Sequence, residues 1–319
     1  MSCPKSANKF MMCFLLYNCA AVFIIAIASI QLSMTGMDAK DIMQFMLLSQ
    51  DVIIFMVPMA AYIIITGEPF KKLVPLKRLS LKNAIYVSAI TLLIMPMMSV
   101  FSQITNMFVS SDVNESFQTV MLDFPWWVSV IYMAVMPPLC EETMFRGYIL
   151  TGYKKAGFAK AALVSALFFG MMHLDLYQLP YATFAGIVMA GFVFYTGSIY
   201  SSMLAHFIVN GSQTAMFLIG TKVMDRAELE KQLAAEVGAD EQLATLYVTM
   251  AVMIFCLPLL LFLINRFVRR NRDNYAAYCT DGAEDIPLYF EERVEKQKIF
   301  DKFFVLSVII YIAYVAIFK

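Results

Sequence analysis

The chain carries a series of long apolar stretches, and most of them are long enough to cross a lipid bilayer. A membrane-spanning helix needs about 20 mainly apolar residues. The 319 residues are 61% hydrophobic and 15% charged, whereas a soluble domain has about 25% charged residues. Lipid leaves an open sheet edge without hydrogen-bond partners, and the period-2 pattern of barrel strands is absent. The sequence therefore predicts an all-α, polytopic transmembrane helical bundle.

We expect about eight spans plus a possible ninth. The apolar stretches have the approximate bounds 10–32, 44–66, 84–108, 126–150, 160–178, 181–200, 203–221, 246–267 and 303–318. These spans divide the chain into N-terminal transmembrane helices at 1–124, a central core at 125–215 and a C-terminal region at 216–319. In that last region we expect an amphipathic external segment at 222–245, one or two further spans and a cytoplasmic linker at 273–300.

Basic residues cluster in particular connections. They are dense at 67–83, at 151–160 and after 265, whereas the connections 109–125 and 222–245 are acidic or mixed. If the connections alternate between the two sides of a membrane, all the basic clusters fall on one face, and the positive-inside rule makes that face and the N-terminus cytoplasmic. With a net charge of +0, no general field attracts nucleic acid. The absence of eukaryotic targeting signals favours a bacterial plasma membrane.

The first polar patch in these apolar stretches is Glu141-Glu142-x-x-x-Arg146, directly after two prolines. Proline removes a backbone donor and kinks a helix, which leaves carbonyl groups free to line a cavity. Glu142 and Arg146 are four residues apart on a helix and can pair directly. Glu141 lies about 100° further round the axis, so the two carboxylates cannot both face one point. We therefore predict a structural Glu142–Arg146 pair, with Glu141 as a general base or acid.

The only two histidines, His173 and His206, both lie in apolar stretches. Titratable groups are costly in hydrocarbon and usually serve a function there. His206 and Asn210 share one helix face, and an imidazole and an amide that converge in a dry site can stabilise an oxyanion. A single buried histidine often only joins two helices, and a Glu–Arg pair often only stabilises a helix. Polar patches on three separate spans, holding both histidines, favour a functional site.

Together these residues resemble the CPBP intramembrane protease family. That family contains the type II CAAX prenyl endopeptidases and the bacteriocin-immunity and abortive-infection-like membrane proteins. Its motifs are Glu-Glu-x-x-x-Arg, then Phe-x-x-x-His, then His-x-x-x-Asn or Asp. The chain supplies them in the same order, as Glu141-Glu142-x-x-x-Arg146, Phe169-x-x-x-His173 and His206-x-x-x-Asn210. The resemblance covers residues 125–215, and the stretch 196–200 also looks like the family.

The resemblance implies an endopeptidase that acts on membrane-associated or lipidated peptides and proteins. In this reading Glu141, assisted by His173, activates water, while His206 and Asn210 stabilise the oxyanion; no cofactor is required. The family is also described as metallopeptidase, in which case Glu141, His173 and His206 would bind Zn²⁺ with a water in the open position. The chain has no HExxH motif and no closely spaced histidine pair. The spacing therefore favours metal-independent glutamate chemistry.

Other functions are compatible with the same polar residues. A non-hydrolytic, bacteriocin-immunity-type protein would bind a peptide in the same pocket, but every motif residue of a protease is present. A proton-coupled transporter would use the glutamates and histidines as a proton relay. Many secondary transporters contain internal repeats, and we find none in this sequence. The ordered match of all the motifs therefore favours the endopeptidase.

Overall fold

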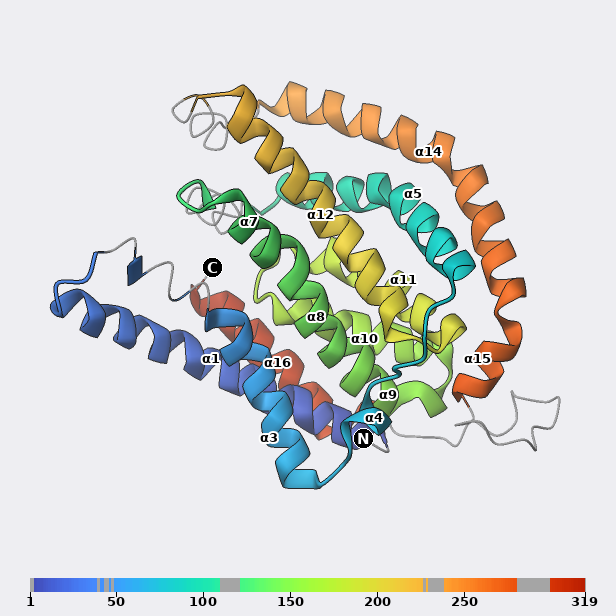
Figure 1. Ribbon diagram of the computed structural model, residues 1–319, viewed down its shortest axis with the longest axis horizontal. Helices are drawn as coiled ribbons and strands as arrows, with labels where there is room; N and C mark the ends of the chain where they lie inside the picture. Colours follow the sequence, from blue (N-terminus) through green and yellow to red (C-terminus); the bar gives the residue numbers. More distant parts are fainter. Residues whose placement is uncertain are drawn as a thin grey trace.

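The computed structural model describes residues 3–38, 41–42, 46, 49–109, 121–225, 228, 238–279 and 299–318. Over these residues the fold is helical without a β-strand, and the only β-type pairing is an isolated bridge between Leu76 and Ser198. Figure 1 shows the helices side by side, with α8, α10, α11 and α12 in the middle of the bundle. The predicted all-α architecture is confirmed.

The helices follow one another with short connections. Their bounds are α1 Pro4–Met34, α3 Val57–Thr66, α4 Phe70–Leu73, α5 Leu81–Asn106, α7 Trp126–Ser129, α8 Met136–Glu142, α9 Leu150–Tyr153, α10 Phe158–Met172, α11 Leu179–Thr196, α12 Ile199–Val223, α14 Ala239–Arg270, α15 Arg272–Cys279 and α16 Lys302–Phe318. A π-helical stretch at Val52–Met56 leads into α3. Two more, at Val130–Val135 and Thr143–Ile149, join α7, α8 and α9 into one helical run.

Five helices of the described chain are long and apolar enough to cross a membrane: Pro4–Met34, Ser49–Thr66, Leu81–Asn106, Leu179–Thr196 and Ala239–Arg270. Two further apolar helices, α10 and α16, are shorter. This composition makes the chain an integral membrane protein. The count of eight spans plus a possible ninth stays a prediction.

Helix ends differ from the predicted bounds where local chemistry sets them. Gly197 adopts a left-handed backbone with φ 66°, which ends α11 and lets α12 begin at Ile199, ahead of the predicted 203. Helix α14 begins at Ala239, ahead of the predicted 246, because Asp240 and Glu241 in its first turn favour a helix start. Most of the predicted external segment 222–245 and of the linker 273–300 lies outside the described residues.

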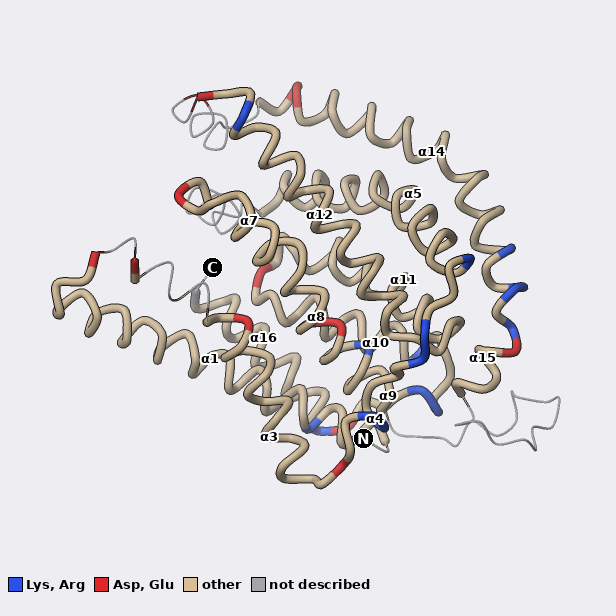
Figure 2. The backbone as a smooth tube through the Cα atoms, viewed as in Figure 1, with Lys and Arg blue, Asp and Glu red and all other residues tan. Residues whose placement is uncertain are grey.

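The basic connections meet at one end of the molecule. Figure 2 shows Lys and Arg gathered there around α4, α9, α15 and the start of α1. Contacts tie these segments together: Lys77 Nζ donates to Asn274 Oδ1 at 2.6 Å, and Lys154 Nζ lies 5.6 Å from the centre of the Tyr278 ring. This clustering agrees with the alternation of connections on which the predicted orientation depends.

Two hydrophobic clusters hold the central helices. One joins α1 and α16 to the run from α8 to α10, and the other joins α5 and α14 to α11 and α12. Helices α10 and α11 form an antiparallel pair with small residues, including Ala166 and Gly186, between them. Small residues let helix backbones approach closely. The run that carries Glu141 and Glu142 is thereby fixed against α10 and α12.

Candidate active site

The two glutamates lie at the end of α8, in a run of helix with unusual geometry. One π-helical stretch ends at Val135, just before Pro137 and Pro138, and another begins at Thr143, just after Glu142. A proline cannot donate to the carbonyl four residues before it, so regular helix pairing is interrupted here. The predicted break thus takes the form of π-helical stretches on both sides of α8, a geometry that is frequent at functional sites.

Glu142 is the centre of a buried ionic cluster. Its Oε1 accepts from Arg146 Nη1 at 2.9 Å and from His206 Nδ1 at 2.9 Å, and the side chains of Glu142 and Arg146 are both 0% exposed. An ionised carboxylate only accepts hydrogen bonds, so Nδ1 of His206 carries the hydrogen. The predicted pair of Glu142 with Arg146 is present. Its second partner, His206, is a contact that we had not predicted.

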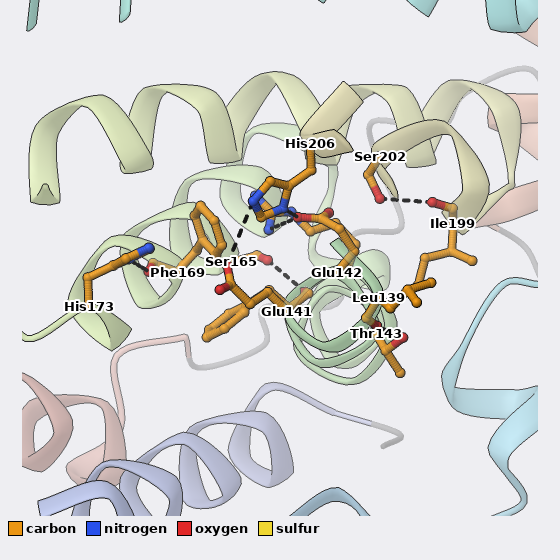
Figure 3. A network of polar contacts seen from close by, with 12 residues as sticks. Leu139, Glu141, Glu142, Thr143, Ser165, Phe169, His173, Ile199, Ser202 and His206 are labelled. Carbon is orange, nitrogen blue, oxygen red and sulfur yellow. Dashed lines mark hydrogen bonds and ion pairs between the residues drawn. The ribbon is translucent and has the colours of Figure 1, made fainter. Parts of the chain in front are cut away.

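The imidazole of His206 lies between the two glutamates (Figure 3). While Nδ1 donates to Glu142, Nε2 is 3.9 Å from Glu141 Oε2. The two carboxylates therefore do not meet at one point, in agreement with their positions on the helix. A single ring nevertheless bridges them, because its two nitrogens point in different directions. Glu141 has 12% of its side chain exposed, against 0% for Glu142.

Phe169 separates the cationic and imidazole groups of the site. Arg146 Cζ lies 4.2 Å above the centre of its ring, a favourable cation–π geometry. The rings of His173 and His206 lie at 5.2 Å and 5.9 Å from it, both nearly perpendicular. The Phe169 carbonyl also accepts from His173 Nδ1 at 3.0 Å. In that tautomer, Nε2 of His173 is a proton acceptor.

The predicted site residues share one cavity of about 390 Å³. Its wall includes Glu141, His173, His206 and Asn210. The other lining residues are Gln50, Asp51, Met98, Tyr132, Met133, Pro137, Phe169, Gln178, Tyr181, Ala182, Ala185, Met189, Val209, Gln213 and Thr214. Within the described chain no hydrogen bond joins Glu141 to His173, so their predicted cooperation depends on a water or substrate atom between them.

The backbone of α11 makes room for the Arg146 side chain. A Cβ atom on Gly186 would lie 3.1 Å from Arg146 Nη2 and 2.8 Å from the Cβ of Ala166. Both contacts are closer than normal packing allows, so a glycine is required here. The guanidinium is therefore enclosed by the Phe169 ring, Glu142 and the glycine backbone.

Sequence reasoning did not find every polar residue of the cavity. Asp51 lines it and is 9% exposed, in a helix whose apolar pattern we had read only as a span. The rule applied to the histidines, that a titratable group in an apolar stretch is functional by default, would have selected Asp51 as well. Gln213 and Thr214 were missed although they follow His206 at seven and eight residues, on the same face of α12.

The candidate zinc ligands do not fit a metal site in this arrangement. Among the described residues, no group of three His, Cys, Asp or Glu side chains could hold a metal ion. Nδ1 of His173 is bonded to a carbonyl and Nδ1 of His206 to Glu142, while Glu141 contacts only the second histidine. A structural or catalytic zinc needs three or four ligands that converge on one point. We therefore derive no step through a metal.

Comparison with known proteins gives one family. No curated protein and no solved structure matches the chain. Residues 123–212 match the model of the family described as type II CAAX prenyl endopeptidase Rce1-like. The matched segment begins before the two glutamates and ends after Asn210, so it contains all the residues described above. The resemblance predicted from the motifs is confirmed: this segment belongs to the Rce1-like family of type II CAAX prenyl endopeptidases.

Proposed function

We propose that this protein is an intramembrane endopeptidase that hydrolyses peptide bonds of membrane-associated or lipidated, CAAX-type peptides and proteins. The observation that carries the proposal is the difference between the adjacent glutamates. Glu142 is occupied by Arg146 and His206, whereas Glu141 borders the cavity that also holds His173 and Asn210. A carboxylate with free lone pairs beside a cavity is suited to general base catalysis.

Glu141 is the base in this mechanism. It accepts a proton from a water molecule, whose oxygen attacks the carbonyl carbon of the scissile peptide bond. Nε2 of His173 accepts the second hydrogen of that water and orients it, because Nδ1 is held by the Phe169 carbonyl. Glu141 then gives its proton to the departing amine, and the peptide bond breaks. Each proton thus has a named donor and acceptor.

His206 and Asn210 stabilise the oxyanion. They lie one helical turn apart on α12 and both line the cavity. The amide of Asn210 donates one hydrogen bond, and Nε2 of His206 donates another when the ring is protonated. Glu142 stabilises that protonated ring through Nδ1 at 2.9 Å, as a carboxylate does for the histidine of a catalytic triad. Donors that are fixed before the reaction contribute strongly to catalysis in a dry site.

The proposal is tested by replacing Glu141 with glutamine. The variant is assayed in proteoliposomes with a prenylated fluorogenic peptide and with a hydrophobic peptide of the same sequence without the lipid. We expect cleavage by Glu141→Gln to fall by at least about a hundredfold, the loss typical of a removed general base. Glu241→Gln, a change of the same kind at an exposed position of α14, should cleave like wild type.

Two other outcomes would point elsewhere. Cleavage that survives Glu141→Gln removes the catalytic assignment. Solute uptake that is lost in Glu141→Gln, with no cleavage by wild type, favours the proton-coupled transporter. In the same assay we expect cleavage to persist with a chelator present. Stoichiometric zinc in the purified protein together with chelator-sensitive cleavage would instead require a metal mechanism.

A further inference from the structure

Asp51 is a buried carboxylate that the proposed mechanism does not use. It directly precedes the π-helical stretch that leads into α3, and it is 9% exposed. Within the described chain its carboxylate has no hydrogen bond and no ion pair, and it borders the same cavity as Glu141. A buried carboxylate without a partner is strongly unfavourable, which indicates that a partner enters from the cavity.

The charges of the cavity indicate what that partner is. Two carboxylates, Asp51 and Glu141, line it, while no lysine or arginine does, and the two histidines are its only basic side chains. Arg146 lies behind Phe169 and is already paired with Glu142. The cavity therefore has an excess of negative charge in surroundings of low polarity, where a cationic group is attracted most strongly.

The shape of the polar surface indicates that the partner is part of a peptide. His206, Asn210, Gln213 and Thr214 form one stripe along α12, and all of them line the cavity. The stripe continues past the proposed catalytic residues. Amide and hydroxyl side chains can pair with the main-chain donors and acceptors of an extended peptide, which needs such partners within the membrane.

We propose that Asp51 is a specificity residue that binds a basic side chain of the peptide substrate, lysine or arginine, close to the scissile bond. This inference rests on the proposed function and adds a substrate class to it. The basic side chain supplies the positive charge that the cavity lacks. Asp51 acts in binding and takes no part in the transfer of protons.

The test compares peptides that differ at one position. In a fluorogenic series, each of the three residues on either side of the scissile bond is in turn lysine or norleucine, which is apolar and of similar size. The readout is the ratio of kcat/KM for the two peptides. At one position we expect wild type to favour lysine by about tenfold or more, as for a desolvated charge pair, and Asp51→Asn to bring the ratio to about one.

Two further variants identify the cause of the change. Asp51→Glu keeps the charge and should retain a preference for lysine. Asp240→Asn is the matched control, because Asp240 is an exposed residue in the first turn of α14 and does not line the cavity. It should leave the ratio as in wild type. The inference is overturned if wild type favours lysine at no position, or if Asp51→Asn keeps the preference.

A binding measurement separates this inference from the proposed function. Fluorescent lysine and norleucine peptides are titrated into Glu141→Gln protein in nanodiscs, with and without Asp51→Asn. Tighter binding of the lysine peptide that is lost with Asp51→Asn supports the role of Asp51, even if wild type hydrolyses no peptide and the proposed function fails. Hydrolysis by wild type without any preference for lysine, in binding or cleavage, overturns the role of Asp51 and leaves the proposed function standing.

Discussion

At the scale of single residues, Glu142 determines how charge is balanced in the buried site. One oxygen, Oε1, accepts from both Arg146 and His206, each at 2.9 Å. None of the Glu142 side chain is exposed, so water cannot replace a lost partner. Removal of one member of a buried ion pair leaves the other charge uncompensated, which costs far more than an exposed pair contributes.

We therefore predict that Arg146→Ala destabilises the protein by about 3–5 kcal/mol. The change leaves the Glu142 carboxylate with only His206 as a partner and opens a void beneath the Phe169 ring. Glu141→Ala should cost much less, because Glu141 borders the cavity and its nearest charged contact is at 3.9 Å. Thermal unfolding of both variants in detergent, together with the folded yield from membranes, measures the difference.

A control variant isolates the effect of burial. Arg269→Ala removes the same side chain from an exposed position in the last turn of α14, and we expect a change within about 0.5 kcal/mol. If Arg146→Ala and Glu141→Ala were equally stable, the division of roles between the adjacent glutamates would be wrong.

The sequence predicts contacts of this site only where they are local. The pairing of Glu142 with Arg146 follows from helical spacing alone. The bond from His206 to Glu142 joins residues 64 positions apart, and only the packing of α12 against α8 brings them together. Asp51 lies even further from Glu141 in the chain. Helical periodicity carries no information about which helices become neighbours, so these contacts required the structure.

At the scale of helices, α10 and α11 pack so closely that single methyl groups decide the fit. At Gly186 an added Cβ would lie 2.8 Å from the Cβ and 2.9 Å from the Cα of Ala166. At Gly170 it would lie 2.5 Å from Thr183 Oγ1. Since the opposing atoms include backbone, the two helices would have to move apart. Without a hydrophobic driving force between helices in lipid, such close packing is a main source of their association.

We predict that Gly186→Ala destabilises the protein by about 1–3 kcal/mol, the usual cost of an overpacked interior. Gly191→Ala is the control on the same helix, because a Cβ there would meet Phe158 at an ordinary 3.7 Å. Alanine is the better helix former, so that variant should be neutral or slightly stabilised. Melting temperatures in one detergent test the pair, and equal losses for both would refute the close approach at Gly186.

Apolar length predicts where most helices lie, and it fails at their ends. Each predicted span contains a helix in the described chain, because hydrocarbon requires backbone groups to pair within a segment. The span predicted at 160–178 shows the limit. Helix α10 ends at Met172, and Leu174 adopts a left-handed backbone with φ 51°. His173 therefore lies at a helix end and not within a helix, which hydrophobicity alone does not reveal.

At the scale of the whole molecule, the two ends of the described chain are joined to the central run of helices. Helices α1 and α16 lie side by side (Figure 1) and share a hydrophobic cluster with α8, α9 and α10. Asn8 connects all three parts: its Nδ2 donates to the Ile299 carbonyl and to Asp301 Oδ1, each at 2.9 Å, and its Oδ1 accepts from the Tyr153 hydroxyl. No local pattern in the sequence predicts this junction.

We predict that Asn8→Ala destabilises the whole bundle by about 3 kcal/mol, because it leaves the buried Tyr153 hydroxyl and the Ile299 carbonyl without their partner. Asn18→Ala is the matched control on the same helix. Asn18 is also buried, but its Nδ2 has no hydrogen-bond partner in the described chain, so its removal should cost little or stabilise. Thermal unfolding in detergent compares the two variants. A loss for Asn18→Ala as large as for Asn8→Ala would mean that the polar junction does not hold the terminal helices to the core.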